Sequence, residues 1–600
     1  MANIIPISST PISSTITTHQ YPKFIPQRAT RRSSCAHKPL LQCFATVDKL
    51  IDTPTVARRS ANYKPCIWDH DYLLSLSNDY KSETYTKQAE KQKEKVRTMF
   101  NNLENPLDQL ELVDTLQRLG LAYHFDSEIN QAMLNVYNTS DDKWKKANLY
   151  ATSLQFRLFR QHGYDVSQEV FSSFKEEKSE SSFKVCLCDD IKALIGLYEA
   201  SHYGFEGESI MDEAWRFTTD HLKPLLDGDN KATTLDPILA MQVKDALELP
   251  LHWRPPRLEA MWFINAYERR EDANHVLLEL AKLDYNIVQA SYQEELKDLS
   301  RWWQKYGPGE KLSFARSRLV ESFLWSMAIA SDPQFGYSRI INTKVIALIT
   351  VIDDIYDVYG TLDELELFTD AVDRWEVGAM EQLPEYMKIA YLTLYNFVNE
   401  MAYDILREQG VDVLMNLKNS WVGLFRAYLV EAKWFHTGTK PTLEEYMKNA
   451  WISIANPILA VHSYISATNP IIEKELNYIE SNPDLLYWVA KIDRLQDDLG
   501  TSSDELQRGD VLKAVQCYMN DTGSSEEVAR EHVKHIVRMM WKKVNVHCST
   551  ETDLSKLSIQ LILNLVRMAH CIYLHGDGHG VPDTVTKDQA LSLLFEPLPL

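Results

Sequence analysis

The sequence predicts an all-α protein, and three observations support this. Apolar residues recur at steps of three and four after residue 82, as in LVDTLQRLGLAYHF and SLQFRLFRQHGYDV, which is the periodicity of amphipathic helices. Alternating apolar runs bounded by Asn-Gly or Asp-Gly turns, the pattern of β-hairpins, do not occur. The chain also lacks GxGxxG and a Walker lysine loop, so a nucleotide-binding α/β fold is not indicated.

The length of the chain, 600 residues, is too great for one hydrophobic core. A Pro- and Arg-rich stretch, LPLHWRPPRLEA, interrupts the helical pattern, which resumes at about residue 274. We therefore expect two helical domains after an N-terminal tail, with bounds 1–57, 58–273 and 274–600.

The tail, residues 1–57, has the composition of an organelle transit peptide. Its first 47 residues contain no Asp or Glu and are rich in Ser, Thr, Lys and Arg, without the compact apolar core of a secretory signal. The alternative is a disordered basic tail that the mature protein keeps.

Charge and composition exclude several kinds of partner. The formal net charge is −21, and no basic stripe with interleaved aromatic residues occurs, so nucleic acid is not an expected partner. No run of 18 or more apolar residues is present, so we expect no membrane span. The eight cysteines are scattered and indicate neither a disulfide framework nor a zinc site.

The tail is followed by an extended segment that begins with adjacent arginines, RRSANYKPCIW. Arg58 and Arg59 can grip an anion if Trp68 anchors the segment as a strap. An exposed processing site followed by an ordinary buried Trp would carry the same residues. Further along, Arg316 and Arg318 lie two positions apart, which fits a helix entrance or loop edge where they could grip different oxygens of one diphosphate. A solvated basic turn would carry the same two residues.

The central stretch of the chain is IALITVIDDIYDVY, residues 346–359. In a helix, Asp353 and Asp357 share one face at the end of an apolar stripe, and Asp354 points about 100° away. Oxygen ligands at this spacing suit Mg²⁺, which keeps waters and bridges to substrate phosphates. A solvated acidic helix end would show the same pattern.

A second acidic set lies 144 residues later, in RLQDDLGTSSDE. Asp497, Thr501 and Glu505 occupy one helical face over two turns and offer a second hard-cation site. Arg494 leans the same way, and Lys513 can reach an anion above this face. Any one of these residues fits a capped acidic helix, but the whole set does not.

Four motifs in this order, RR-x8-W, R-x-R, DDxxD and D-D-x-x-T-x-x-x-E, resemble the terpene synthase family of plants, in particular its plastidial monoterpene synthases. LYEAS, EAKW and RMAHCIYLHGDGHG extend the resemblance over almost all of residues 58–600. The family often has Asp where this chain has Ser317, which weakens the expected positioning of that loop. No D-x-D-D occurs, so protonation-initiated cyclisation is not implied.

The resemblance implies a barrel-like, catalytically inactive helical scaffold at 58–273 and a class I terpene synthase domain at 274–600. It implies three Mg²⁺ ions, with Mn²⁺ as a possible substitute, held by Asp353, Asp357, Asp497, Thr501 and Glu505 with Asp354 behind them. Arg316, Arg318, Arg494 and Lys513 would bind the diphosphate, and Arg58 and Arg59 would close the mouth and assist isomerisation. Trp325 and Tyr573 are candidates for the aromatic faces that a carbocation needs, although each could equally be a core residue. The resemblance favours His579 as the proton acceptor, a role that released diphosphate can also fill. The residues expected to line the pocket are Ile346, Leu424 and Ile454.

The function that the resemblance implies is a plastid stromal lyase that converts geranyl diphosphate to a cyclic monoterpene and diphosphate, ending in deprotonation or water capture. Acyclic products of the linalool or myrcene type, and a C15 substrate, are the near alternatives. A non-catalytic helical scaffold is the distant one. We expect a monomer or weak homodimer.

Overall fold

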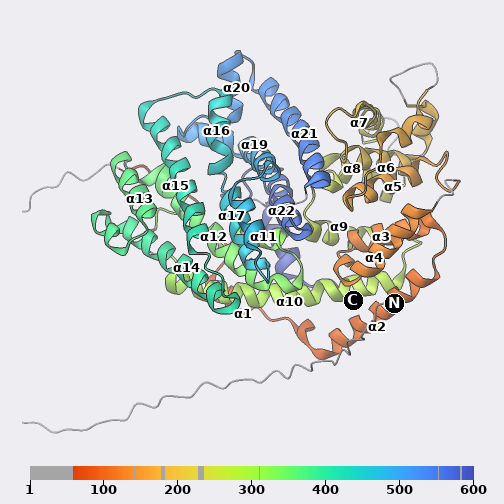
Figure 1. Cartoon of the computed structure of the whole chain (residues 1–600), viewed down its shortest axis with the longest axis horizontal. Helices are drawn as coiled ribbons and strands as arrows, with labels where there is room; N and C mark the ends of the chain where they lie inside the picture. The colour runs from red at the N-terminus through yellow and green to blue at the C-terminus, as the bar shows by residue number, and fades with distance from the viewer. Residues whose placement is uncertain are drawn as a thin grey trace, which may run out of the picture. The chain divides into compact units, whose positions relative to one another are not determined.

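The computed structural model describes residues 58–139, 143–176, 183–226, 236–309, 311–551, 553–581 and 584–600. Within these ranges the regular elements are all helices, apart from one isolated β-bridge between Lys175 and Phe183 (Figure 1). The all-α prediction is therefore confirmed. The predicted transit peptide lies outside the described residues.

The helices fall before and after the long helix α10. Those before it are α1 His70–Ser75, α2 Glu83–Asn102, α3 Pro106–Arg118, α4 Asp126–Asn138, α5 Leu149–Gln161, α6 Ile191–Ser201, α7 Ser209–Leu222, α8 Pro237–Glu248 and α9 Pro256–Glu268. From there on they are α10 His275–Tyr306, α11 Leu319–Ile329, α12 Gly336–Asp354, α13 Leu362–Arg374, α14 Glu385–Gln409, α15 Leu414–Thr437, α16 Leu443–Ser453, α17 Asn456–Ala467, α18 Glu473–Glu480, α19 Asp484–Arg508, α20 Ala514–Thr522, α21 Glu526–Thr550, α22 Lys556–Ile572 and α23 Thr584–Ala590. Short 3₁₀ segments are Asp79–Lys81, Ala122–His124, Gln168–Phe174, Val185–Asp189, Lys223–Leu225, Leu251–Trp253, Pro333–Phe335 and Val377–Gln382, and π-helical turns are Ile355–Tyr359 and Leu591–Phe595.

Local sequence signals explain where several helices begin and end. Asn105 caps α3 through the backbone N–H of Leu107, and the proline at the first helical position has no N–H to leave unpaired. Thr361 and Glu364 form a capping box at the start of α13. Gly410 ends α14 in the left-handed region, which glycine adopts without steric cost.

Helix α10 takes part in two hydrophobic cores. Its first half, with Leu280 and Tyr285, belongs to a core built mainly from residues before 160. Its second half, with Tyr292 and Leu296, belongs to the largest core, which runs on to Phe595. The described chain from Arg58 to Leu600 forms one compact unit, so the proposed division at 273/274 stays a prediction.

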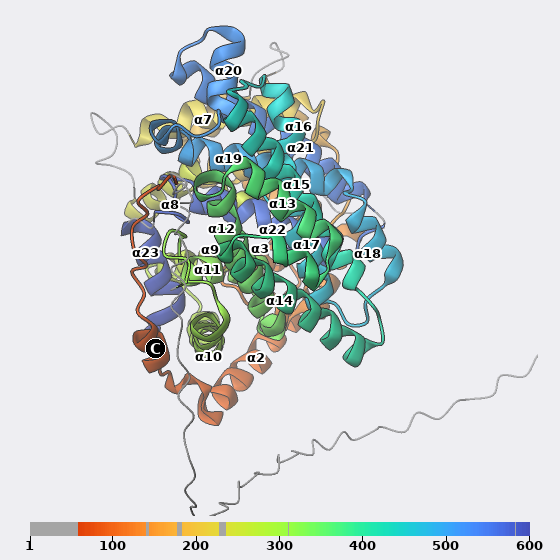
Figure 2. The ribbon, with the colours of Figure 1, turned by 90° about the vertical axis from the view of Figure 1, so that its left-hand side faces the viewer.

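Helix α12 is a buried helix that packs against α11 and α17 (Figures 1 and 2). The segment Pro333–Tyr359 is long and apolar enough to pass a membrane-span test by length and composition, but 67% of its apolar window is buried inside the protein. A helix in the centre of a folded core passes the same test, because its neighbours replace lipid around it. The segment is therefore weak evidence for a membrane span.

Three buried histidines lie among two tryptophans where α22 and the segment Leu251–Trp253 meet. Trp541 Nε1 donates to His570 Nε2 at 2.8 Å, and the His202 and Trp253 rings are 5.1 Å apart. Burial lowers the pKa of His202 to about 4 and that of His570 to about 3, and it lowers the pKa of His252 well below its usual range. These rings are therefore neutral in the folded protein at pH 5.

The three histidines are expected to contribute a loss of stability as pH drops from 7 to 5. Below about 6.5 the unfolded chain protonates them while the folded chain does not, so their contribution to the free energy of unfolding decreases until pH approaches the folded pKa values. Buried carboxyls with raised pKa values, such as Asp245, act in the opposite direction, so the histidine contribution is measured as a difference between variants. Urea midpoints measured between pH 5 and 7 test this. His570→Gln keeps an acceptor for Trp541 and should flatten the slope, whereas exposed His436→Gln should not. Equal slopes in all three proteins would contradict the expectation.

Candidate active site

A pocket with an empty volume of about 1000 Å³, open mouth included, lies among α11, α12, α15–α17 and α19. Its wall includes side chains that are more than 500 residues apart in the chain. The lining residues are Tyr63, Arg316, Trp325, Ile346, Ile349, Thr350, Asp353, Asp357, Tyr428, Ser453, Ile454, Ala455, Asn456, Leu459, Asp493, Arg494, Asp497, Thr501, Glu505, Asp510, Lys513, Tyr573, Asp577 and His579.

The first acidic edge of the pocket comes from the end of α12. Asp353 lies in the last α-helical turn, and Asp357 lies in the π-helical turn that continues it, closed by Gly360 N–H donating to Ile355 O at 2.8 Å. The sequence predicted an unbroken α-helix here, so the π turn corrects that expectation. Gly360 permits it, because a Cβ there would come within 2.9 Å of Ile355 O. Such turns are frequent at functional sites.

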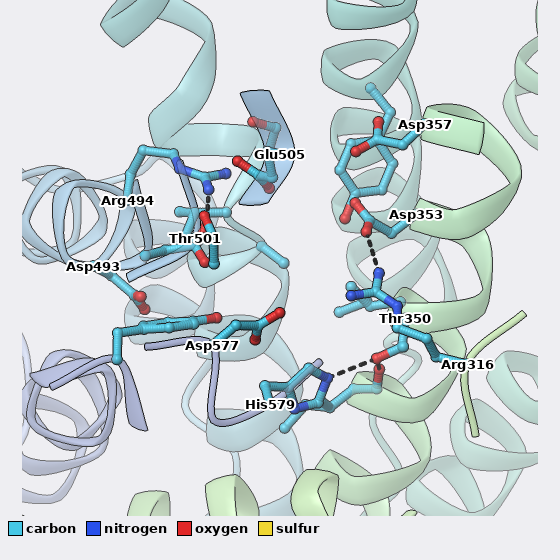
Figure 3. Close-up of a pocket in the computed structure, with 18 of the residues that line it drawn as sticks. Arg316, Thr350, Asp353, Asp357, Asp493, Arg494, Thr501, Glu505, Asp577 and His579 are labelled. Carbon is cyan, nitrogen blue, oxygen red and sulfur yellow. Dashed lines mark hydrogen bonds and ion pairs between the residues drawn. The ribbon is translucent and has the colours of Figure 1, made fainter. Parts of the chain in front are cut away.

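The neighbouring carboxylate, Asp354, is fully buried and does not line the pocket. Its oxygens accept hydrogen bonds from Arg316 N at 2.6 Å and from Arg316 Nε at 2.8 Å. Arg316 Nη2 also donates to Asp353 at 2.7 Å (Figure 3). Asp354 thus aims the Arg316 guanidinium at the pocket.

The second acidic edge comes from α19, on the opposite side of the pocket in Figure 3. Asp497, Thr501 and Glu505 all line the pocket, at the spacing of successive helical turns. Arg494 forms an ion pair with Asp497, and its Nε donates to Asp498 at 2.9 Å.

Asp498 is a residue whose role the sequence analysis missed. It is fully buried, and it also accepts from Tyr446 Oη at 3.0 Å and from the backbone N–H of Ala514 at 2.9 Å. Both Asp-Asp pairs therefore work alike: the first carboxylate lines the pocket, and the second holds an arginine. The parallel with Asp354 was the signal in the sequence that would have found it.

The carboxylates of the first acidic edge are unfavourable to ionise together. Burial raises the pKa of Asp353, and it raises that of Asp357 well above its usual range, with the nearby charge of Asp353 adding to the effect. Lys513 Nζ, also buried, lies 3.9 Å from Glu431. A cation between the two edges would relieve this repulsion.

The donor set fits hard divalent ions. Carboxylate and hydroxyl oxygens line both edges, and the Thr501 hydroxyl has no hydrogen-bond partner although it is buried. Among the described residues, no three His, Cys, Asp or Glu side chains already form a complete metal site. Mg²⁺ is usually held by one or two carboxylates together with substrate phosphates and water.

Away from the acidic edges the pocket wall is mostly apolar and aromatic. Ile346 lies two turns before Asp353 on α12, and Ile454 lies at the junction of α16 and α17. The Trp325 and Tyr573 rings are 6.1 Å apart and tilted by 59°. The structure thus brings these four predicted pocket residues together.

His579 enters the pocket from the glycine-rich loop that follows α22. Its Nε2 is 3.0 Å from Thr350 Oγ1, and its Nδ1 is buried without a partner (Figure 3). Burial lowers the pKa of this imidazole to about 3, and the nearby Arg316 adds to the effect. His579 is therefore neutral at physiological pH.

Arg58 and Arg59 lie beside the pocket and do not line it. Arg58 makes two 2.8 Å hydrogen bonds to Glu364, and Arg59 donates to Asp357 O at 2.9 Å and to Asp510 at 2.7 Å. The strap that follows brings the Tyr63 ring to within 4.7 Å of the Arg316 guanidinium carbon. Figure 2 shows this segment, in red, rising from α1.

Two further predicted residues, Arg318 and Leu424, do not line the pocket either. Arg318 was expected to bind diphosphate, but it is buried and its guanidinium donates to Gly580 O at 2.8 Å and to Lys64 O at 2.9 Å. Leu424 was expected in the pocket wall, but it lies on α15 with its side chain buried in the largest hydrophobic core. Helical periodicity could not show which way either side chain faces.

Several further pocket residues gave no clear signal in the sequence. Tyr63 and Asp510 come from irregular segments, where no periodicity predicts direction. Asp577 belongs to the HGDGHG loop and accepts from Gly580 N at 2.6 Å. Tyr428 and Asp493 lie on helices whose pocket-facing sides depend on their neighbours.

An all-α body whose pocket combines two carboxylate edges, buried arginine and lysine, and aromatic side chains has the features of a metal-dependent enzyme that acts on a small molecule. Two protein-family models match the sequence. The model of the terpene synthase N-terminal domain matches residues 67–247, and the model of the terpene synthase family metal-binding domain matches residues 304–543. The chain belongs to the terpene synthase family and is a lyase.

Three relatives illustrate the similarity. Myrcene synthase, chloroplastic, from Quercus ilex is 54% identical over 562 residues, 93% of each chain. A crystal structure of limonene synthase with 2-fluorolinalyl diphosphate is 43% identical with a TM-score of 0.87, covering 90% of this chain and 100% of that one. Isoprene synthase from grey poplar leaves (Populus x canescens), in complex with three Mg²⁺ ions and dimethylallyl-S-thiolodiphosphate, is 44% identical with a TM-score of 0.81, covering 89% and 99%.

Proposed function

We propose that this protein is a monoterpene synthase that converts geranyl diphosphate to a cyclic monoterpene and diphosphate. The observation that carries the proposal is the pair of acidic edges, on α12 and α19, that share one pocket with an apolar, aromatic interior. One end of such a pocket suits an ionic leaving group and the other a hydrocarbon chain.

Asp353 and Asp357 would hold divalent ions at one edge, and Asp497, Thr501 and Glu505 at the other. We propose three Mg²⁺ ions, with Mn²⁺ as a substitute, and the isoprene synthase complex supports this number. When bound, the ions neutralise the charge that develops on the departing diphosphate.

Arg316, Arg494 and Lys513 would bind the diphosphate, since all three line the pocket and carry positive charge. We assign Arg318 a different role from the one the sequence suggested. The Arg318 guanidinium donates hydrogen bonds to Lys64 O in the strap and to Gly580 O in the glycine-rich loop, and it thereby connects these two segments. The strap, with Arg58 and Arg59, would close the mouth, exclude water and assist isomerisation of the bound diphosphate.

The rest of the pocket would shape and protect the carbocation. Trp325 and Tyr573 present aromatic faces, which attract a cation without offering it a nucleophilic lone pair. Ile346 and Ile454 would limit how the chain folds. His579 Nδ1 is a candidate proton acceptor, because it is buried, neutral and without a partner.

Ring formation is part of our proposal, because the relatives are named for both kinds of product: myrcene is acyclic and limonene is cyclic. Acyclic products or a C15 substrate are the alternatives. The relatives' chloroplastic names support a plastid location, and we propose the stroma. We further propose that residues 58–273 are a scaffold and 274–600 the catalytic domain, in a monomer or weak homodimer.

Incubating the full chain with geranyl, neryl and farnesyl diphosphates tests the function. With Mg²⁺ we expect volatile C10 products from geranyl diphosphate, measured by gas chromatography with mass spectrometry. EDTA should lower the rate at least ~100-fold, because ionisation loses several kcal/mol of charge stabilisation, and excess Mg²⁺ should restore it.

The control is the same incubation with heat-denatured protein, which reveals spontaneous solvolysis of the substrate. No volatile product from any of the three diphosphates would defeat the proposal. A product from farnesyl diphosphate alone would favour the C15 alternative, and an activity unaffected by EDTA would remove the role given to the two acidic edges.

A further inference from the structure

Two polar side chains in the pocket remain without partners and without a part in the proposed reaction. Asn456 and Asp493 both line the pocket, and each is 1% exposed. Both polar atoms of the Asn456 side chain and Oδ1 of Asp493 have no hydrogen-bond partner in the protein. Burying such groups without partners costs about 1–3 kcal/mol each, so a bound polar molecule is the natural explanation.

The two side chains are neighbours. Burial raises the pKa of Asp493 to about 8, and the nearby Asn456 amide opposes this effect. At neutral pH the Asp493 carboxyl is therefore largely protonated, and it offers a hydroxyl donor as well as an acceptor. With the amide of Asn456, the pair supplies donors and acceptors from two directions.

The pair lies in the interior part of the pocket. Asp493 is one helical turn before Asp497 on α19, on the side away from Glu505 (Figure 3). Asn456 is the first residue of α17. It follows Ala455, whose φ of +71° interrupts the helical geometry between α16 and α17. Ile454, at the end of α16, and Leu459, in the first turns of α17, also line the pocket.

The hydroxyl groups of Ser453 and Thr350, which also line the pocket, are already engaged. Ser453 donates to Glu431 and to Ala450 O, and Thr350 donates to Ile346 O and pairs with His579. A small polar guest in this part of the pocket would therefore be held by Asn456 and Asp493. The hydrocarbon part of the substrate has no polar group that could pair with these two side chains.

We infer that Asn456 and Asp493 hold a water molecule that ends the reaction, so that the main product is a monoterpene alcohol. This inference rests on the proposed function and adds how the reaction ends. The site is polar, enclosed and offers the two to four partners that a bound water needs. A water so oriented directs a lone pair into the pocket.

The step balances without a further reactant. A lone pair of the water oxygen forms a bond to the cationic carbon, and the resulting oxonium loses one proton. The diphosphate released in the same reaction takes up that proton. The sum is geranyl diphosphate plus water giving a C10 alcohol, C10H18O, and protonated diphosphate, with no oxidation or reduction.

The test is product analysis of the full-length enzyme with geranyl diphosphate in water enriched in ¹⁸O. The wild type should give mainly an alcohol carrying one ¹⁸O atom. Asn456→Leu and Asp493→Leu should lower the alcohol share at least tenfold and give hydrocarbons instead, because both remove the water's partners. Asp493→Asn keeps hydrogen-bonding atoms and should keep the alcohol.

Asn265→Leu, an exposed position on α9, is the matched control and should give wild-type products. Alcohol without label would come from cleavage of the phosphate ester and would overturn the inference. So would a wild type that makes only hydrocarbons, or leucine variants that keep the labelled alcohol. If no volatile product forms at all, both the proposed function and this inference fail. If only hydrocarbons form, the inference fails but the proposed monoterpene synthase function stands. Circular dichroism melting curves show whether each variant is folded.

Discussion

Asp353→Asn is expected to lower kcat/KM for geranyl diphosphate by at least ~1000-fold, with the fold intact. The substitution removes a charged ligand from the acidic edge at the end of α12, and a loss of about 4 kcal/mol in transition-state stabilisation corresponds to this factor. Burial raises the pKa of Asp353, so a neutral amide of the same size relieves a desolvated charge. Steady-state kinetics and thermal melting together measure both effects.

The matched control is Asp370→Asn on α13, whose side chain is largely exposed and pairs with Arg374 at 3.6 Å. It removes the same charge outside the pocket and should leave kcat/KM within about twofold, since such surface pairs contribute little. A variant of Asp353 that keeps a tenth of the wild-type activity would show that this carboxylate is not a required ligand.

Arg339→Ala is expected to lower the free energy of unfolding by about 3–5 kcal/mol, the usual cost of breaking a buried ion pair. Arg339 lies on α12 and is fully buried. It makes hydrogen bonds of 2.8 and 2.7 Å to the two oxygens of Glu295 on α10, and it donates to Ala330 O at 2.7 Å. The alanine leaves the carboxylate and the carbonyl without a partner.

Urea denaturation followed by circular dichroism measures this loss. Arg301→Ala is the control, because Arg301 forms an exposed pair with Asp298 three residues away on α10 and should change stability by less than about 0.5 kcal/mol. If both variants unfold at the wild-type urea concentration, the buried pair does not hold α12 in place.

Much of the site followed from spacing within single helices. A turn of 3.6 residues places Asp497, Thr501 and Glu505 on one face whatever surrounds them, and the structure has all three on the pocket wall. The same rule separated Asp354 from Asp353 and Asp357. It failed where the chain leaves helical geometry: the π turn at Asp357 was not predicted.

Other assignments failed because direction depends on neighbours. R-x-R suggested two similar arginines, yet Arg316 faces the pocket while Arg318 turns inward to Gly580 and Lys64. Arg318 directly precedes α11, where no helical periodicity applies. Tyr63 was missed for a similar reason, since nothing in an extended segment shows which residue it will cover.

The sequence by itself determined the all-α class, the helices that carry the two acidic sets, and the family. These depend on local periodicity and residue chemistry, which a linear chain already contains. Tertiary structure decided what the second carboxylate of each Asp-Asp pair holds and which buried polar groups, Asn456 and Asp493 among them, lack partners. Burial and partnership are properties of packed helices, because contacts between residues hundreds of positions apart exist only once the core has closed.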